Sequence, residues 1–169
     1  MGSRGVYDRF RGRIMFPLFD VRHNMVGFSG RILPQLDDGK TGKYINSPET
    51  VIYHKSQLLF GLSINKEHIR KKGHVVIVEG ELDVLASMRA NVREVVAVKG
   101  VALTLEQVKL LKRFCETIIL ALDSDQAGTT AAKRAIEVAQ GVDMQVRVVE
   151  LTGGKDPDEL VTSDPKFLA

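Results

Sequence analysis

The feature that most constrains the fold is the run VVIVE at Val75–Glu79, which is β-branched throughout and closes on a carboxylate. Gly80 follows it, and a helical pattern begins at Glu81. A short, continuous apolar run is typical of a strand buried on both faces, as in parallel sheets. In open α/β sheets, ligands bind beyond the carboxyl ends of the strands. We therefore expect Glu79 to lie at a functional edge of a parallel sheet.

A second apolar run also ends in acid. Residues 117–122 lead directly into Asp123, Ser124 and Asp125. Carboxylates gathered at one sheet edge repel one another unless a cation neutralises them. Oxygen ligands with little His or Cys nearby favour Mg²⁺ or Mn²⁺ over zinc. The four His are scattered and there is a single Cys, so we expect no zinc site. The pattern predicts a magnesium or manganese site that handles phosphates.

After Gly73 the chain alternates regularly between strand and helix patterns. We expect strands at 75–79, 94–98, 117–122 and 144–150, with helices at 81–90, 105–114 and 127–140. Such alternation favours a parallel sheet with right-handed crossovers. If Glu79 and the acids after residue 122 share a metal, the first and third strands must be neighbours. The predicted strand order is therefore 2-1-3-4.

Charge divides the 169 residues into two parts. Through Lys72 there are 13 Lys and Arg against 6 Asp and Glu, and from Gly73 there are 11 against 15. We predict a basic, mostly antiparallel β lobe at 1–72 and an acidic α/β domain at 73–169. This split fits an enzyme that binds a polyanion with one part and a metal with the other; the alternative is surface charge that divides this way by chance.

The basic part begins with alternating arginines. Arg9, Arg11 and Arg13 precede an apolar run, so a strand would place all three on one side. A hairpin turn at 20–24 and a returning strand at 25–33 follow. Before Gly73, residues 63–72 form a helix pattern, for which we expect Ser63 to be the cap.

Further along, the segment GKYINSPET combines a charge, a ring and an amide in Lys43, Tyr44 and Asn46. This mixture suits single-stranded nucleic acid or a nucleotide, although Asn-Ser-Pro alone also predicts a plain turn. Near the end of the chain, the pattern around Asp156 is typical of a helix N-cap. Capping explains Asp156 well but explains Asp158 less well.

In combination, EGELD, DSDQAG and DPD resemble the Toprim domain that bacterial primases, topoisomerases and some nucleases share. The segments FRGRIMFPL, GFSGRIL, GKYINSPET and HKSQLLFGL are similar, in order and spacing, to the basic region that precedes Toprim in bacterial DNA primases. Two positions depart from that family, Ser29 in place of a glycine and Gly100-Val101 in place of Gly-Thr.

The resemblance implies two sets of site residues. The metal-binding acids would be Glu79, Asp83, Asp123, Asp125, Asp156 and Asp158, with Glu79, Asp123 and Asp125 catalytic. The surface for template and nucleotide would comprise Arg11, Arg31, Lys43, Asn46 and Lys55, joined by Tyr44 as a stacking ring. For Asp83, a favourable acid in the first turn of a helix is an equally good interpretation.

The resemblance also implies a function, the synthesis of short RNA primers on single-stranded DNA by metal-dependent nucleotidyl transfer with two or more Mg²⁺ or Mn²⁺ ions. The partners would be the DNA template, ribonucleoside triphosphates, the RNA–DNA hybrid and, through regions not in this chain, the replicative helicase. We expect a cytoplasmic location at the replication fork, with no membrane partner, and we interpret the chain as a fragment of the primase core that need not be active alone.

Three other functions remain. Another Toprim enzyme, a topoisomerase or nuclease, would share the acids but not GKYINSPET. A haloacid-dehalogenase-type phosphatase also carries DxD after a strand, with its first Asp as nucleophile, but leaves EGELD unexplained. A module that only binds metal or nucleic acid is the non-enzymatic alternative. An EF-hand is excluded, because Ala127 occupies a ligand position and Arg134 stands where the closing Glu belongs.

Overall fold

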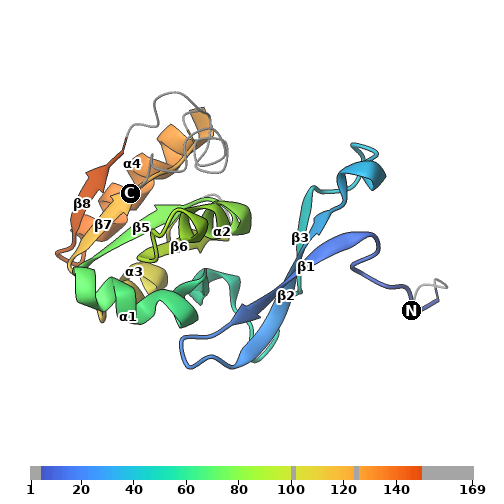
Figure 1. Ribbon diagram of the computed structural model, residues 1–169, viewed down its shortest axis with the longest axis horizontal. Helices are drawn as coiled ribbons and strands as arrows, with labels where there is room; N and C mark the ends of the chain where they lie inside the picture. Colours follow the sequence, from blue (N-terminus) through green and yellow to red (C-terminus); the bar gives the residue numbers. More distant parts are fainter. Residues whose placement is uncertain (1–4, 100–101, 124–125, 150–169) are drawn as a thin grey trace.

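The computed structural model describes residues 5–99, 102–123 and 126–149, which form two sheets (Figure 1). The smaller sheet has the order β1-β2-β3 and contains β1 (Arg13–Phe19), β2 (Met25–Ile32) and β3 (Tyr44–Asn46). All its pairings are antiparallel, with Arg13 opposite Ile32 and Ser29 opposite Asn46. In Figure 1 this sheet extends away from the larger one.

The larger sheet has the order β4-β6-β5-β7-β8. Its strands are β4 (Leu59–Phe60), β5 (His74–Val78), β6 (Val95–Val98), β7 (Thr117–Leu120) and β8 (Gln145–Val148). The last four are parallel, with Val76 opposite Val95 in β6 and opposite Ile119 in β7, whereas β4 runs antiparallel to β6. The predicted order 2-1-3-4 is therefore confirmed, and a short antiparallel strand is added beside β6.

Four helices connect these strands: α1 (Leu62–Lys72), α2 (Glu81–Arg89), α3 (Leu105–Leu111) and α4 (Gln126–Gln140). Short 3-10 turns, η1 (Pro34–Leu36) and η2 (Lys55–Gln57), lie in the loops. Thr104 caps α3, accepting a hydrogen bond from the Gln107 amide, while the Gln107 side chain accepts one from the Thr104 amide. No described helix combines the length and apolar character needed to cross a membrane.

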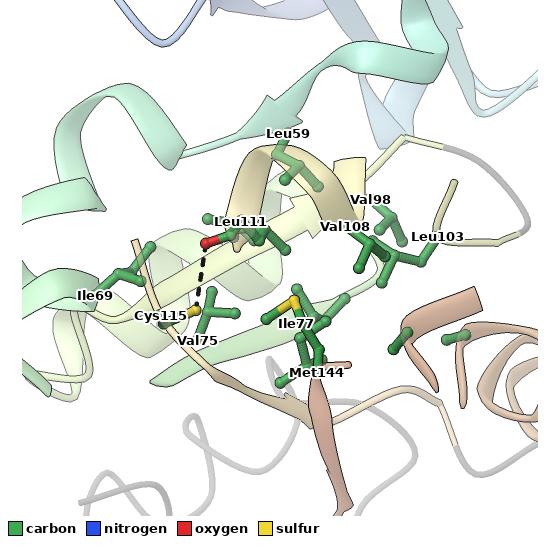
Figure 2. Packing of buried hydrophobic residues seen from close by; sticks show 14 of the residues in the cluster. Leu59, Ile69, Val75, Ile77, Val98, Leu103, Val108, Leu111, Cys115 and Met144 are labelled. Atoms are coloured by element: carbon green, nitrogen blue, oxygen red, sulfur yellow. Dashed lines mark hydrogen bonds between the residues drawn. The ribbon is translucent and has the colours of Figure 1, made fainter. Parts of the chain in front are cut away.

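The two faces of the larger sheet bury separate clusters. Val75 and Ile77 of β5 pack with residues of α1, α3 and α4, whereas Val78 packs with Val84 of α2. This division follows from the alternation of side chains along a strand, which sends neighbours to opposite faces. Figure 2 shows the first cluster, in which the Cys115 thiol donates to the Leu111 carbonyl at 3.7 Å. The apolar run that predicted a doubly covered strand is thus explained.

Two local predictions were wrong. Residues 9–12 form a turn, with Gly12 at φ +63°, so β1 begins only at Arg13 and the arginines do not alternate along a strand. Helix α1 begins at Leu62, so Ser63 lies inside it, and Gly61 at φ +88° takes the capping position without a side-chain bond. Glycine adopts a positive φ without steric cost, so the chain can turn into the helix at Gly61 without a polar cap.

Strand β4 and helix α1 precede residue 73 in the chain, yet β4 pairs with β6 in the larger sheet and α1 packs against that sheet. The division of the chain at residue 72 stays a prediction.

Candidate active site and nucleic-acid interface

The carboxyl ends of β5 and β7 bring two of the predicted acids together. Glu79 follows β5, and Asp123 lies three residues beyond the end of β7. The backbone amide of Asp123 donates to Glu79 Oε1 at 3.2 Å. Because β5 and β7 are adjacent and parallel, acids that are 44 residues apart in sequence lie side by side. Both side chains are half-buried.

Gly128 holds this edge in place. A β-carbon at Gly128, in the first turn of α4, would collide with the Asp123 carbonyl oxygen and come within 3.2 Å of the Asp123 nitrogen. Only glycine allows backbone to approach backbone so closely. The glycine of the DSDQAG segment is therefore a packing requirement that seats α4 directly beside Asp123.

Asp83 has a structural part at the start of α2. Its Oδ2 accepts a hydrogen bond from the Gly80 amide at 2.9 Å, and its carbonyl accepts one from the Ser87 hydroxyl at 2.7 Å. The side chain is buried. An acid at this position satisfies a helix N-terminal donor and complements the helix dipole, so the first-turn interpretation explains its geometry.

The opposite wall is basic and comes from β2 and β3, and η2 adds a further lysine to the cavity. Arg31 donates to the Tyr44 hydroxyl at 3.0 Å, and its guanidinium lies 5.4 Å from the centre of the Tyr44 ring. Burial raises the pKa of the Tyr44 phenol, although the charge of Arg31 acts in the opposite direction. Lys43 is exposed, and the Lys55 amide donates to Glu49 at 2.7 Å, which fixes the start of η2.

Two polar atoms in this wall are buried without a hydrogen-bond partner among the described residues, Ser29 Oγ and Asn46 Oδ1. Ser29 and Asn46 lie opposite each other in the β2–β3 pairing. Buried polar atoms usually have partners, so such exceptions indicate where a ligand group can bind.

A cavity of about 430 Å³ separates the acidic edge from the basic wall. Its lining includes eight of the predicted site residues: Arg31, Lys43, Tyr44, Asn46, Lys55, Glu79, Asp83 and Asp123. Arg11 is exposed and does not line this cavity. The remaining predicted acids, Asp125, Asp156 and Asp158, lie outside the described residues.

A larger cavity of about 510 Å³ has mostly apolar walls and shares none of these residues. It is lined by Phe19, Asp20, Val21, Val26, Ile52, His54, Gln57, Leu58, Leu59, Leu62, Glu106, Lys109, Leu110 and Arg113. Neither Glu79 nor Asp123 reaches it, which makes the smaller cavity the candidate site.

Sequence reasoning missed three charged or polar residues of the smaller cavity as site residues, Ser29, Glu81 and Lys99. Lys99 and Glu81 form a buried ion pair. One signal could have found Lys99, since it directly follows the apolar run VVAV just as Glu79 follows VVIV. Glu81 gave no such signal, because an acid that opens a helix is common.

Comparison with known proteins agrees with this architecture. Residues 76–161 match the Toprim-like family, and residues 2–66 match the N-terminal domain of the DNA primase catalytic core. The fold and the acidic edge thus define a Toprim-like domain joined to a primase-type basic region.

Curated relatives and solved structures narrow the assignment. The chain is 46% identical to the DNA primase of Synechococcus elongatus and 39% identical to that of Clostridium acetobutylicum, over 93% and 97% of its residues. It covers 23% and 27% of those proteins, so it spans about a quarter of the length of the curated relatives it matches.

Among structures, the Aquifex aeolicus primase (zinc-binding and RNA polymerase domains) superposes with a TM-score of 0.88 at 37% identity, over 98% of this chain and 41% of that one. A DnaG primase catalytic domain bound to single-stranded DNA superposes at 0.83 and 39% identity, over 95% of this chain and 50% of that one. The chain therefore belongs to the DnaG-type DNA primase family, and the part of those proteins that it matches is the catalytic core.

Proposed function

We propose that this chain is the catalytic part of a bacterial DNA primase, which joins ribonucleotides into short RNA primers on a single-stranded DNA template. The observation that carries the proposal is the cavity itself, where the carboxyl ends of two parallel strands present Glu79 and Asp123 to the basic wall of β2 and β3. This arrangement suits a reaction between phosphates, because the carboxylates can bind metal ions and the cationic side chains can bind the phosphates of a polyanion.

The basic wall supplies contacts for nucleic acid and nucleotide. Lys43 and Lys55 offer ammonium groups for phosphate, and the stacked Arg31–Tyr44 pair offers a planar surface for a base. Asn46 adds an amide whose buried oxygen has no partner among the described residues. Arg11, exposed beyond the cavity, would extend the basic surface along the template or the RNA–DNA hybrid.

The acidic edge fits a hard divalent cation by the chemistry of its donors. Toprim domains are in general metal-dependent, and carboxylate oxygens are the ligands that Mg²⁺ and Mn²⁺ prefer. Within the described residues, no three His, Cys, Asp or Glu side chains converge closely enough to hold a metal. Glu79 and Asp123 would hold such ions together with Asp125, and Asp83, Asp156 and Asp158 would contribute further oxygens.

In this proposal the metal ions would neutralise charge on the triphosphate and lower the pKa of the attacking hydroxyl. Glu79 stays fixed by the Asp123 amide, so its second carboxylate oxygen can act as a ligand or accept the hydroxyl proton. The basic wall orients the template and the nucleotide opposite this edge. Positioning and electrostatic complementarity supply most of the catalysis in phosphoryl transfer, and both are built into the cavity.

The replicative helicase would be a partner through regions outside this chain, and a cytoplasmic location at the replication fork follows from the same proposal.

The substitution Glu79→Gln distinguishes the primase from a phosphatase. It keeps the side chain's size and an acceptor for the Asp123 amide while removing the charge. In a bacterial primase whose corresponding core region is replaced by this chain, template-directed primer synthesis should fall by about two orders of magnitude or more. Thermal unfolding of the chain should be unchanged within a few degrees.

A phosphatase would use Asp123 as a covalent nucleophile and would tolerate Glu79→Gln, and beryllofluoride would add to Asp123. Full primer synthesis in the folded variant would overturn the proposed function.

A further inference from the structure

A buried ion pair between Glu81 and Lys99 lies in the wall of the cavity, and the roles proposed above do not use it. The Lys99 and Glu81 side chains are 4% and 6% exposed, and the Lys99 ammonium donates to Glu81 Oε1. A buried ion pair is often no more stabilising than two well-packed apolar side chains. Stability alone therefore gives little reason for this pair at a ligand cavity.

The Lys99 ammonium has more hydrogen-bond donors than its described partners accept from. It carries three N–H donors, and Glu81 is its only hydrogen-bond acceptor among the described residues. Burial lowers the pKa of Lys99, and the Glu81 carboxylate acts in the opposite direction, toward the charged form. A buried cation whose described partners fill one of its three donors is suited to an anionic ligand that enters the cavity.

Lys99 also lies on the acidic side. It directly follows β6, the neighbour of β5, whose next residue is Glu79. Of the other cations that line the cavity, Arg31 and Lys43 come from the opposite wall, whereas Lys55 lies near Lys99 and lines a smaller hollow together with it. Among the described lining residues, Lys99 is therefore the cation that the larger sheet itself contributes.

We propose that Lys99 binds a phosphate group of a nucleoside triphosphate in this cavity, with Glu81 holding its ammonium in place. The inference rests on the proposed function and deepens it, because it adds a positive contact on the side of the carboxylates. Nucleic acid also carries phosphates, but Lys99 is buried within the cavity, whereas a strand that passes over the surface would contact exposed side chains such as Lys43.

The test uses the 169-residue chain and replaces the pair together, as Glu81→Met with Lys99→Met. This double variant leaves the net charge unchanged, so long-range electrostatics cannot explain a difference. Lys99→Met alone strands a buried carboxylate and should melt roughly 10 °C lower. The double variant should melt close to the wild type. The control is Glu67→Gln with Arg70→Gln, which removes an exposed ion pair on α1 and also preserves net charge.

Calorimetry with a non-hydrolysable nucleoside triphosphate and Mn²⁺ should show affinity about tenfold or more weaker in the double variant, as expected for the loss of a charged hydrogen bond. The control pair and Lys99→Arg should bind as the wild type does. A single-stranded oligonucleotide should bind all variants alike.

Equal triphosphate affinity in the wild type and the double variant would overturn this inference alone, as would a loss confined to the oligonucleotide. A wild-type chain that binds no triphosphate would overturn the proposed function as well.

Discussion

The two sheets differ in how they are held together, and the difference matches their proposed tasks. The larger sheet is covered on both faces and buries most of β5, β6 and β7. The smaller sheet buries only a few side chains, such as Phe16, Leu18 and Ile32, and leaves Ile14 and Met25 exposed. A rigid sheet suits acids that must hold a fixed geometry, whereas a thin, half-covered sheet leaves polar groups available to a ligand.

The strongest way to break this comparison is to disturb the edge of the rigid sheet. Gly128→Ala forces a β-carbon into the Asp123 carbonyl, where backbone rather than a flexible side chain must move. We expect a loss of about 3 kcal/mol in the free energy of unfolding, measured with urea. Gly141→Ala is the matched control, because its β-carbon would meet nothing closer than 3.5 Å. Equal stability of the two variants would contradict the close packing of α4 on Asp123.

The same contrast explains which parts of the fold could be predicted from the sequence. The continuous run at Val75–Val78 predicts a doubly covered strand, and the need to bring Glu79 near Asp123 fixes the strand order that the structure confirms. The arginine alternation failed because a left-handed Gly12 turns the chain before β1, and spacing alone does not show this.

In the site, the residues that sequence reasoning missed depend on contacts between segments that are distant in sequence. Lys99 and Glu81 meet only because the end of β6 lies beside the start of α2, and no local pattern couples residues 18 positions apart. The Ser29 hydroxyl, which has no hydrogen-bond partner within the described part of the chain, likewise depends on what β3 places opposite it.

A second prediction concerns the charge at the rigid edge. Asp123→Asn should weaken Mn²⁺ binding by more than about tenfold, since even the hydrogen-bond partners of metal ligands contribute that much. In EDTA the variant should melt no lower than the wild type, because it relieves repulsion with Glu79. Calorimetry measures the first effect and thermal unfolding the second, with the exposed Asp143→Asn as control. Unchanged Mn²⁺ affinity would remove Asp123 from the site.

A third prediction concerns the pH dependence of stability, which should reflect the burial of Cys115 in the core of the larger sheet. Burial raises the pKa of the Cys115 thiol to about 11, against an ordinary value of 9.0. The folded chain therefore keeps a proton that the unfolded chain loses above pH 9, and this contribution to stability disappears as pH rises through 11.

Between pH 8 and pH 10, the wild type should lose about 1 kcal/mol more unfolding free energy than Cys115→Ala. Parallel pH profiles for the two proteins would mean that the thiol is not enclosed as described.

The smallest expected effect lies in the basic sheet. Lys43 is exposed at the cavity rim, so Lys43→Ala should leave the melting temperature unchanged and weaken single-stranded DNA binding modestly. The slope of log affinity against log salt should fall by about 1, because one phosphate contact is lost. Lys133→Ala on α4 is the matched control. A larger effect from Lys133 would move the nucleic-acid surface to the other sheet.

The most direct test of the account is a crystal structure of the chain with Mn²⁺ and a non-hydrolysable nucleoside triphosphate. We predict that the phosphates lie in the 430 Å³ cavity, between the carboxylates of Glu79 and Asp123 and the basic wall at Arg31 and Lys43. Binding of the triphosphate in the 510 Å³ apolar cavity, or outside both, would contradict the claim that the two sheets meet around the nucleotide.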